Sequence, residues 1–264
     1  MQIIYGFLLA IVVAYLAYRA RSLNGSGAVA AVVVGTIVFG IGGLRWAILL
    51  LTFFVTSSGL SRAFKKRKEG LSEKFSKGHE RDAGQVFGNG GLATLFAALH
   101  LFYPESILPW VGFAASLAAV NADTWATELG VLNPTPPRLI TDPRKRVEKG
   151  TSGGVSLWGT GASLLGSAII ALVAVLLSPI DTVNTNYFLL ITAAGTSGSL
   201  FDSFLGATIQ AMYYCPTDQK ETEKHPLHTC GTQTVHLRGW NWLNNDWVNF
   251  ACGAFGVVIA FLFL

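Results

Sequence analysis

The chain has 264 residues, of which 51% are hydrophobic and only 13% are charged, and its mean hydropathy is +0.47. Soluble domains carry about 25% charged residues, so this composition excludes an ordinary soluble domain and indicates one membrane domain. The net charge of +4 does not indicate nucleic-acid binding, because membrane proteins place excess Lys and Arg on their cytoplasmic side. Three cysteines are too few for a disulfide scaffold.

Long apolar stretches along the chain predict an all-α, polytopic transmembrane helical bundle of about eight spans, with six to eight compatible with the pattern. The first stretch is followed by Arg19 and Arg21 and preceded by no positive charge. This is the reverse of a signal peptide, so we expect a retained helix. Only Leu44 and Arg45 separate the second and third spans, which predicts a tight hairpin or a re-entrant pair. The expected spans are 3–18, 28–43, 46–60, 86–103, 108–128, 153–177, 187–210 and 247–264.

The positions of Lys and Arg predict how the bundle is oriented. With the N-terminus outside, the cytoplasmic connections, including loops 61–85, 129–152 and 211–246, contain 18 of the 19 basic residues, and only Arg45 falls outside. The basic run 65–68 is interpreted as an anchor on anionic headgroups or, alternatively, as an attraction for an anionic substrate. We expect an integral protein of a prokaryotic inner membrane or a thylakoid, with its active site on the cytoplasmic face.

Two carboxylates lie near the end of the fifth span. Asp123 is five residues from Glu128, which is about 7.5 Å deeper in a helix, and charged groups at such depth are costly. Asn121, Thr124 and Glu128 share one helical face. Such oxygen-rich groups suit Mg²⁺; the alternative is a solvated helix end.

Asp202 lies deep in the seventh span, about 12 Å from Gln210 at helical rise. We expect it to face a wet cavity or a partner. Gly195, Ser199 and Ser203 recur every four residues, a small-residue stripe that indicates close helix packing.

A glycine-rich turn precedes the sixth span, at the end where that helix begins. Helix N-termini with free backbone N–H groups attract anions, and basic residues lie upstream, so the segment is a candidate phosphate site. The alternative is an ordinary cap and turn. The candidate residues are Arg138, Arg144, Arg146, Lys149, Gly150, Thr151, Ser152, Gly153 and Gly154.

Further polar clusters open the fourth and eighth spans at the same end. Gln85 and Asn89 are helical neighbours in one cluster, as are Asn245 and Asn249 in the other. Capping explains one such cluster, but not readily several at one face. Separately, Cys215, His225, His228 and Cys230 fit no standard zinc-finger spacing, which favours a polar loop over a zinc site.

Several motifs in consecutive order resemble the phytyl-phosphate kinase family of the tocopherol pathway, which includes the transmembrane protein 19 group of DUF92-type integral membrane proteins. They begin at about residue 81 and end near residue 250. The motif segments are 81–86, 121–130, 137–141, 150–156, 198–207 and 244–246.

The resemblance implies transfer of a phosphoryl group from a nucleoside triphosphate, with CTP favoured over ATP, to an isoprenyl monophosphate such as phytyl phosphate. Such transfer depends on positioning and charge neutralisation. We expect Asp123, Glu128 and Asp202 to hold Mg²⁺ with help from Asn121, and Arg81 to bind the acceptor phosphate. The glycine turn and its basic neighbours would bind the triphosphate, and we expect Asn245 and Asp246 to contact the same phosphates.

The lipid tail is expected to leave sideways between apolar helices, beside the fourth, fifth and seventh spans. Membrane lipid is the surrounding partner, and no nucleic acid is expected. Two alternatives stay open at this point: a CTP-dependent cytidylyltransferase of a lipid phosphate, and a non-enzymatic, ion-coupled transporter, which would also use intramembrane carboxylates.

Overall fold

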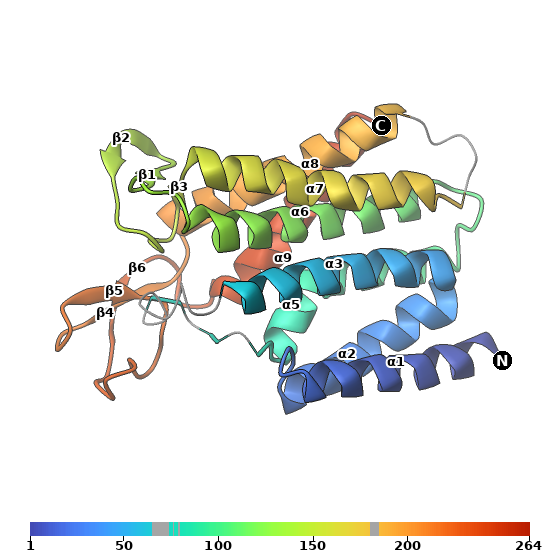
Figure 1. The fold of residues 1–264 in the computed structure, drawn as a ribbon, viewed down its shortest axis with the longest axis horizontal. Coiled ribbons are helices and arrows are strands. Elements are labelled where there is room, and N and C mark those ends of the chain that lie inside the picture. The colour runs from blue at the N-terminus through green and yellow to red at the C-terminus, as the bar shows by residue number, and fades with distance from the viewer. Residues whose placement is uncertain (65–73, 76, 79, 180–184) are drawn as a thin grey trace.

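A computed structural model describes residues 1–64, 74–75, 77–78, 80–179 and 185–264, so the basic run 65–68 lies outside the described residues. Long helices lie side by side in one bundle, as predicted, and α1 begins at the end opposite the small strands (Figure 1). The helices are α1 Gln2–Arg19, α2 Gly25–Ile37, α3 Leu44–Ala63, α5 Ala83–Leu99, α6 Leu108–Gly130, α7 Leu157–Leu176, α8 Thr185–Thr208 and α9 Asn245–Leu262.

Six helical stretches among the described residues are long and apolar enough to cross a membrane. They are α1, α2 together with the π-helix that follows it, α3, α7, α8 and α9. Helix α6 lies at the centre of the bundle, packed against α3, α5, α7, α8 and α9. Its residues from Pro109 to Ala122 are all buried. Because its neighbours cover it, α6 can carry polar residues that a lipid-facing helix could not.

Small residues allow α8 to approach α6 and α7 closely. A Cβ added to Gly195 would lie 2.2 Å from the Ser167 hydroxyl, and one added to Gly198 would lie 2.6 Å from Ala119 Cβ. Ser199 is 3% exposed. The predicted packing role of the small-residue stripe is therefore confirmed at Gly195, whereas Ser199 and Ser203 also line the polar cavity described below.

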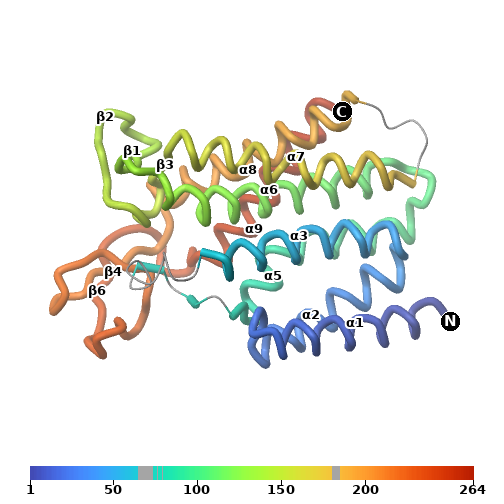
Figure 2. Tube along the Cα trace, in the orientation of Figure 1, coloured from blue at the N-terminus to red at the C-terminus, as the bar shows by residue number. Residues whose placement is uncertain are grey.

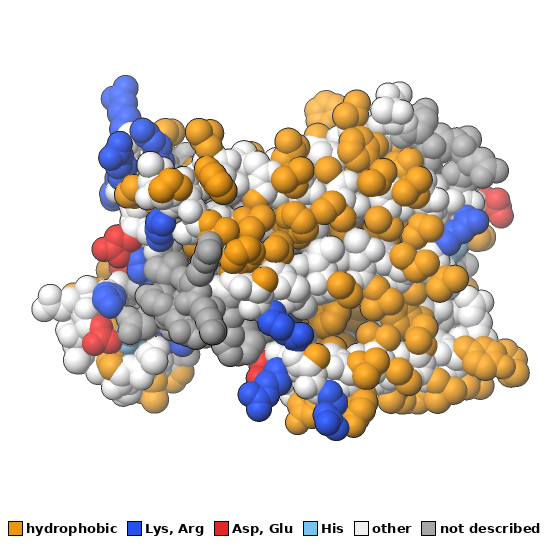
Figure 3. All heavy atoms as spheres, in the orientation of Figure 1, with side chains coloured by type: hydrophobic (Ala, Val, Ile, Leu, Met, Phe, Trp, Pro, Cys, Tyr) orange, Lys and Arg blue, Asp and Glu red, His pale blue; other side chains and the backbone are white. Residues whose placement is uncertain are grey.

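Large apolar side chains cover the outside of the bundle, whereas Lys and Arg gather toward the end with the strands (Figure 3). Leu8, Leu165 and Leu189 are each more than half exposed, an arrangement that suits contact with lipid rather than water. Arg45 donates a hydrogen bond of 2.8 Å to the Ser178 carbonyl, just beyond the C-terminus of α7. Arg45 is thus at the opposite end from the strands, and which end faces the cytoplasm stays a prediction.

The second and third spans form a tight helical hairpin. After α2, the π-helix η1 (Val38–Gly42) is followed by Gly43 alone, and α3 begins at Leu44. Gly43 has φ 76°, a left-handed conformation that glycine adopts without steric cost. A single glycine therefore reverses the chain.

Two three-stranded antiparallel sheets lie at one end of the bundle (Figure 2), where the all-α prediction had loops and, for residues 154–155, the start of the sixth span. Their strands have two to five residues, too short for an alternating pattern to be visible in the sequence. The first sheet contains β1 Arg138–Leu139, β2 Asp142–Arg146 and β3 Gly154–Val155, in the order β2-β1-β3. The second contains β4 Met212–Cys215, β5 Lys220–Thr222 and β6 Val235–Arg238, in the order β5-β4-β6.

Candidate functional site

A cavity of about 380 Å³ lies where the helices meet the strand-bearing segments. Carboxylates, amides and hydroxyls from α5, α6, α8 and α9 line it together with the glycine turn, and its cations come from the segments just before α5 and just before that turn. The charged residues that line it are Lys77, Arg81, Asp123, Glu128, Lys149, Asp202 and Glu223. Two helices far apart in sequence, α6 and α8, thus bring the three predicted carboxylates to one cavity.

The three predicted metal-binding carboxylates face this cavity. Glu128 is 5% exposed and accepts a 2.8 Å hydrogen bond from the Ser61 hydroxyl. Asp123 lies close enough to Asp202 for their charges to interact. Asp202 Oδ2 is buried and has no hydrogen-bond partner among the described residues. A buried carboxylate oxygen without a donor, beside a second carboxylate, is a site that a cation would stabilise.

Asn121 occupies a different position from the one predicted. It is fully buried, and its Oδ1 accepts hydrogen bonds from the Thr56 hydroxyl at 3.0 Å and the Ser57 hydroxyl at 3.1 Å. Its Nδ2 donates to the Gly166 carbonyl at 2.8 Å. The predicted role in metal binding is therefore corrected: Asn121 joins α3, α6 and α7 and lies behind the cavity wall.

Arg81 is fixed by both its backbone and its side chain. Its N–H donates to the Ser22 carbonyl, and its own carbonyl accepts from Asn24 N–H, both at 3.0 Å. The guanidinium carbon lies 5.4 Å and 5.9 Å from the ring centroids of Phe53 and Phe54. Burial lowers the pKa of Arg81 to about 10, although the charge of Glu128 opposes this shift. Arg81 is thus a pre-positioned cation at neutral pH.

The glycine turn lines the cavity with all five predicted residues, 150–154. Gly150 and Gly153 have φ 77° and 85°, and a Cβ on Gly153 would lie 2.5 Å from Ala207 Cβ on α8. The Ser152 hydroxyl donates to Gln210 Oε1 at 2.9 Å.

The turn does not, however, form the N-terminus of the sixth span. Helix α7 begins at Leu157, where Ser156 caps it by accepting a hydrogen bond from Gly159 N–H. The expected helix-end phosphate site is corrected to a turn that leads into β3, because glycines with positive φ interrupt the helix.

The predicted basic clamp is mostly outside the cavity. Arg138, Arg144 and Arg146 lie on β1 and β2 and are exposed, and Arg138 donates to the Pro143 carbonyl at 2.6 Å. Only Lys149 of the four lines the cavity. The basic residues of a short surface strand alternate between its faces and extend into solvent, so sequence proximity to the turn does not bring them inside.

Lys77 lines the cavity and was not predicted. It forms ion pairs with Asp82, at 2.9 Å, and with Asp246. Asp246 does not line the cavity, so its predicted role in phosphate binding is corrected to holding Lys77. The only sequence signal for Lys77 was its place in the basic loop 61–85.

Helix capping accounts for part of the polar clusters at the starts of α5 and α9. Asp82 and Gln85 form a reciprocal capping box, and Asn244 accepts hydrogen bonds from the first turn of α9. The next residues face the cavity, among them Asn89, Asn245 and Asn249. Capping and cavity lining thus coexist within each cluster.

Gln210 and Glu223 also line the cavity and were missed. Gln210 Nε2 donates to Glu223 Oε1 at 3.0 Å, which ties the end of α8 to the residue after β5. No sequence pattern marks this pair, because the contact depends on how the second sheet folds back.

An apolar crevice of about 70 Å³ meets the polar cavity at one side. Helices α1, α2, α3 and α5 form it, and its walls include Ala14, Val34, Phe39 and Phe54. Arg81, Gln85 and Asn89 line both spaces. A molecule with a charged head and an apolar tail would therefore find its two environments side by side.

The fold and this cavity define a polytopic integral membrane protein with a charged site at one end of its helical bundle. The chain belongs to the family described as integral membrane protein DUF92, whose model matches residues 8–257. This membership confirms the family resemblance drawn from the motifs.

Three relatives illustrate the range of the family. Protein PGR of Arabidopsis thaliana is 33% identical, over 94% of this chain and 91% of its own length. An uncharacterized membrane protein of Methanocaldococcus jannaschii is 35% identical, over 75% of this chain and 79% of its own length. Protein VTE6, chloroplastic, of Arabidopsis thaliana is 29% identical, over 91% and 65%. No solved structure matches the chain.

Proposed function

We propose that this protein is a Mg²⁺-dependent membrane kinase that transfers a phosphoryl group from a nucleoside triphosphate, CTP by preference, to an isoprenyl monophosphate such as phytyl phosphate. The observation that carries the proposal is the junction of the polar cavity with the apolar crevice at Arg81, Gln85 and Asn89. The similarity to protein VTE6 supports a role related to prenyl-phosphate kinases.

The carboxylates fit the metal that such a reaction uses. Mg²⁺ prefers carboxylate oxygens together with substrate phosphates, and Asp123, Glu128 and Asp202 line one cavity, with Asp202 Oδ2 lacking a hydrogen-bond partner in the described part of the chain. These three residues would hold the ion, which when bound neutralises charge on the phosphates.

The nucleotide phosphates are assigned to the glycine turn and Lys149. The hydroxyl of Thr151 and the ammonium of Lys149 line the cavity and are suitable donors to phosphate oxygens. Arg144 and Arg146, exposed on β2, would raise the local concentration of anions without contacting the bound nucleotide.

The acceptor phosphate is assigned to Arg81. A phosphate monoester is ionised at neutral pH, so its oxygen attacks the γ-phosphorus without a strong general base, the bond to the leaving diphosphate oxygen breaks, and CDP departs. The isoprenyl tail would enter the crevice between α1, α2, α3 and α5, and not the expected space beside α5, α6 and α8.

The direct test uses the purified full-length protein in detergent with Mg²⁺, phytyl phosphate and each of CTP, ATP, GTP and UTP. We expect phytyl diphosphate and CDP as products. Release of pyrophosphate would instead identify a cytidylyltransferase, and absence of nucleotide binding would favour an ion-coupled transporter; either result overturns the proposal.

Substitution of the carboxylates tests the proposed site. We expect Asp202→Asn and Asp123→Asn each to lower kcat by about 100-fold or more, because each removes a charge that fixes the reacting phosphates. Asp142→Asn, on exposed β2, is the matched control and should keep activity within about twofold, since exposed substitutions away from a site have little effect. Full activity of both cavity variants would refute the metal assignment.

A further inference from the structure

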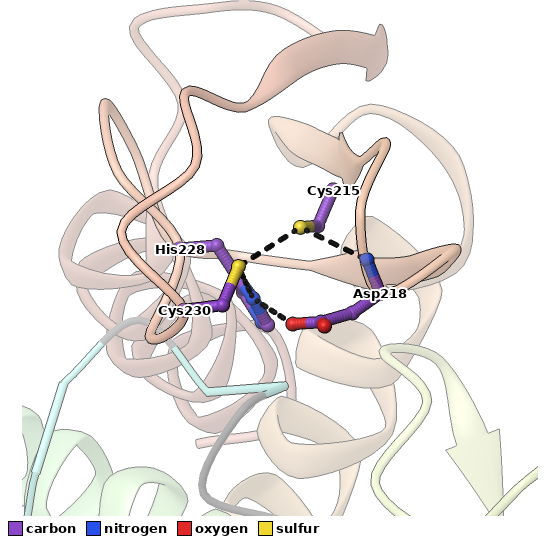
Figure 4. Close-up of side chains that lie close together, drawn as sticks. All are labelled: Cys215, Asp218, His228 and Cys230. Atoms are coloured by element: carbon purple, nitrogen blue, oxygen red, sulfur yellow. Dashed lines mark hydrogen bonds and ion pairs between the residues drawn. The ribbon is translucent and has the colours of Figure 1, made fainter.

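Two tight turns of the second sheet bring four metal-binding side chains together (Figure 4). Cys215 ends β4, and Asp218 lies in the turn before β5. His228 and Cys230 belong to a second turn, which is closed by a 2.9 Å hydrogen bond from His228 N–H to the Thr232 carbonyl. One ligand atom from each of the four residues lies within 4.8 Å of all the others.

Three of the distances between these atoms are close to, but shorter than, the edges of a coordination tetrahedron. The two sulfurs are 3.5 Å apart, Cys230 Sγ is 3.5 Å from His228 Nδ1, and His228 Nδ1 is 2.8 Å from Asp218 Oδ2. Tetrahedral Zn²⁺ with ordinary bond lengths places two sulfurs about 3.8 Å apart, sulfur and nitrogen about 3.6 Å, and nitrogen and oxygen about 3.3 Å. Small outward shifts of the side chains would make room for the ion.

We propose that Cys215, Asp218, His228 and Cys230 bind one Zn²⁺ ion at a structural site separate from the polar cavity. Two thiolates and an imidazole favour zinc over hard cations such as Mg²⁺ or Ca²⁺. Four protein ligands close the coordination sphere, which is typical of structural rather than catalytic zinc.

Two of the four side chains are buried, whereas Asp218 is half-buried and Cys230 is exposed, and the buried pair supports a metal over an ordinary polar loop. Cys215 is 0% exposed and His228 is 4% exposed, although the surrounding strands are short. The cysteines are free thiols, and their sulfurs are separated by more than the roughly 2.05 Å of a disulfide bond. A buried imidazole between a carboxylate and two sulfurs is the environment of a ligating histidine.

The ligand spacing explains why the sequence did not favour zinc. Asp218 replaces His225 of the predicted set, because His225 stacks on Tyr213 with ring centroids 4.4 Å apart. The true pairs are Cys-x₂-Asp and His-x-Cys, and the turns that align them are joined by a 2.8 Å hydrogen bond between the Thr217 and Thr232 hydroxyls.

The site lies beside the segment that completes the cavity wall. Thr222, at the end of β5, is fully buried, and the next residue, Glu223, lines the cavity and contacts Gln210. A zinc ion between the β4–β5 turn and the 228–232 turn would fix this strand. Its function is thus to hold the second sheet in shape.

Metal analysis of the full-length protein, purified in detergent under reducing conditions without chelator, tests the site. We expect about one zinc per chain and a loss of about tenfold in the Cys215→Ser/Cys230→Ser double variant. Cys252→Ser, buried in α9, and His236→Ala, exposed on β6, are matched controls that should keep the metal. Co²⁺ in place of zinc should give the absorption of tetrahedral thiolate coordination.

A second series covers the case in which the double variant does not fold. Asp218→Ala should release zinc at a lower chelator concentration than the natural protein, whereas Asp218→His should retain it. No zinc or Co²⁺ uptake by the natural protein, a Cys215–Cys230 disulfide in the protein purified without reductant, or equal chelator resistance of Asp218→Ala would each overturn the proposal.

Discussion

The two small sheets share a topology but differ in how they are held. In each sheet the first strand in sequence, β1 or β4, lies at the centre. The second strand pairs with it on one side and the third strand on the other. All five residues of β2 are exposed, whereas β4 is mostly buried. The first sheet thus presents cations to solvent, and the second surrounds the cysteine and histidine cluster.

The difference shows that short strands need support from outside the sheet. Strands of two to five residues bury too little apolar surface to be stable alone. In the first sheet, the Gly153 turn packs against Ala207 of α8. In the second, the proposed zinc ligands connect the turns. Both sheets contact the end of α8, since Arg238 of β6 donates to the Gly206 carbonyl at 3.0 Å, and the proposed zinc site would give the second sheet a cross-link of its own.

Removal of the metal by a chelator should produce the largest difference between the two sheets. Structural zinc contributes directly to folding, so we expect removal of the metal to increase amide hydrogen exchange of β4, β5 and β6 by about tenfold or more. Exchange of β1, β2 and β3 should change little, which makes the first sheet the internal control. Mass spectrometry of peptides from both segments measures this. Equal increases in both sheets would show that they do not have independent supports.

Gly153→Ala tests the support of the first sheet. The added Cβ would clash with Ala207 at a positive φ, so we expect destabilisation of about 1–3 kcal/mol and reduced nucleotide turnover. Gly161→Ala, with no atom within 4 Å of the added Cβ, is the matched control and should be neutral or slightly stabilising. Thermal unfolding in detergent measures both. Equal stability of the two variants would contradict the packing explanation.

Lys77→Met tests the ion pairs through which Lys77 connects the start of α5, at Asp82, to the start of α9, at Asp246. Burial lowers the pKa of Lys77, but hydrogen bonds to Asp246 and Asp82 outweigh it and raise the pKa above 10.5. Burial raises the pKa of Asp82, but the hydrogen bond from Lys77 and that from Gln85 N–H lower it below 3.8. The ion pairs therefore stabilise the protein between these limits, and their contribution is lost as pH falls through the lowered pKa of Asp82 or rises through the raised pKa of Lys77.

We expect Lys77→Met to lower the stability by about 1 kcal/mol at neutral pH. The difference from the natural protein should shrink as the pH falls below 3.8 and through the lowered pKa of Asp82. Lys145→Met, which removes an exposed cation from β2, is the control. Unfolding temperatures of both proteins, measured from neutral pH into acid, test whether the stability difference falls with pH as expected. A difference that persists in acid would mean that the loss comes from packing rather than from charge.

Part of the site could be predicted from single residues. Asp123 and Asp202 were identifiable because an ionised group inside an apolar helix is costly and needs a specific partner. Arg144 and Arg146 were predicted wrongly as clamps, since being close in sequence to a glycine turn does not determine which way a strand faces. Asn121 is also polar and is more deeply buried than either aspartate, but its hydrogen-bond partners come from α3 and α7, which no local pattern reveals.

The sequence by itself determined the membrane class, the helices and the segregation of basic residues, because hydropathy and charge act residue by residue. Only the tertiary structure decided that Arg81 joins a polar cavity to an apolar crevice and that Asp218, not His225, joins the cysteines. Those arrangements depend on contacts between distant segments, which turn geometry and helix packing set together. Both the polar cavity and the cysteine and histidine cluster are therefore formed by residues from segments that are separate in sequence.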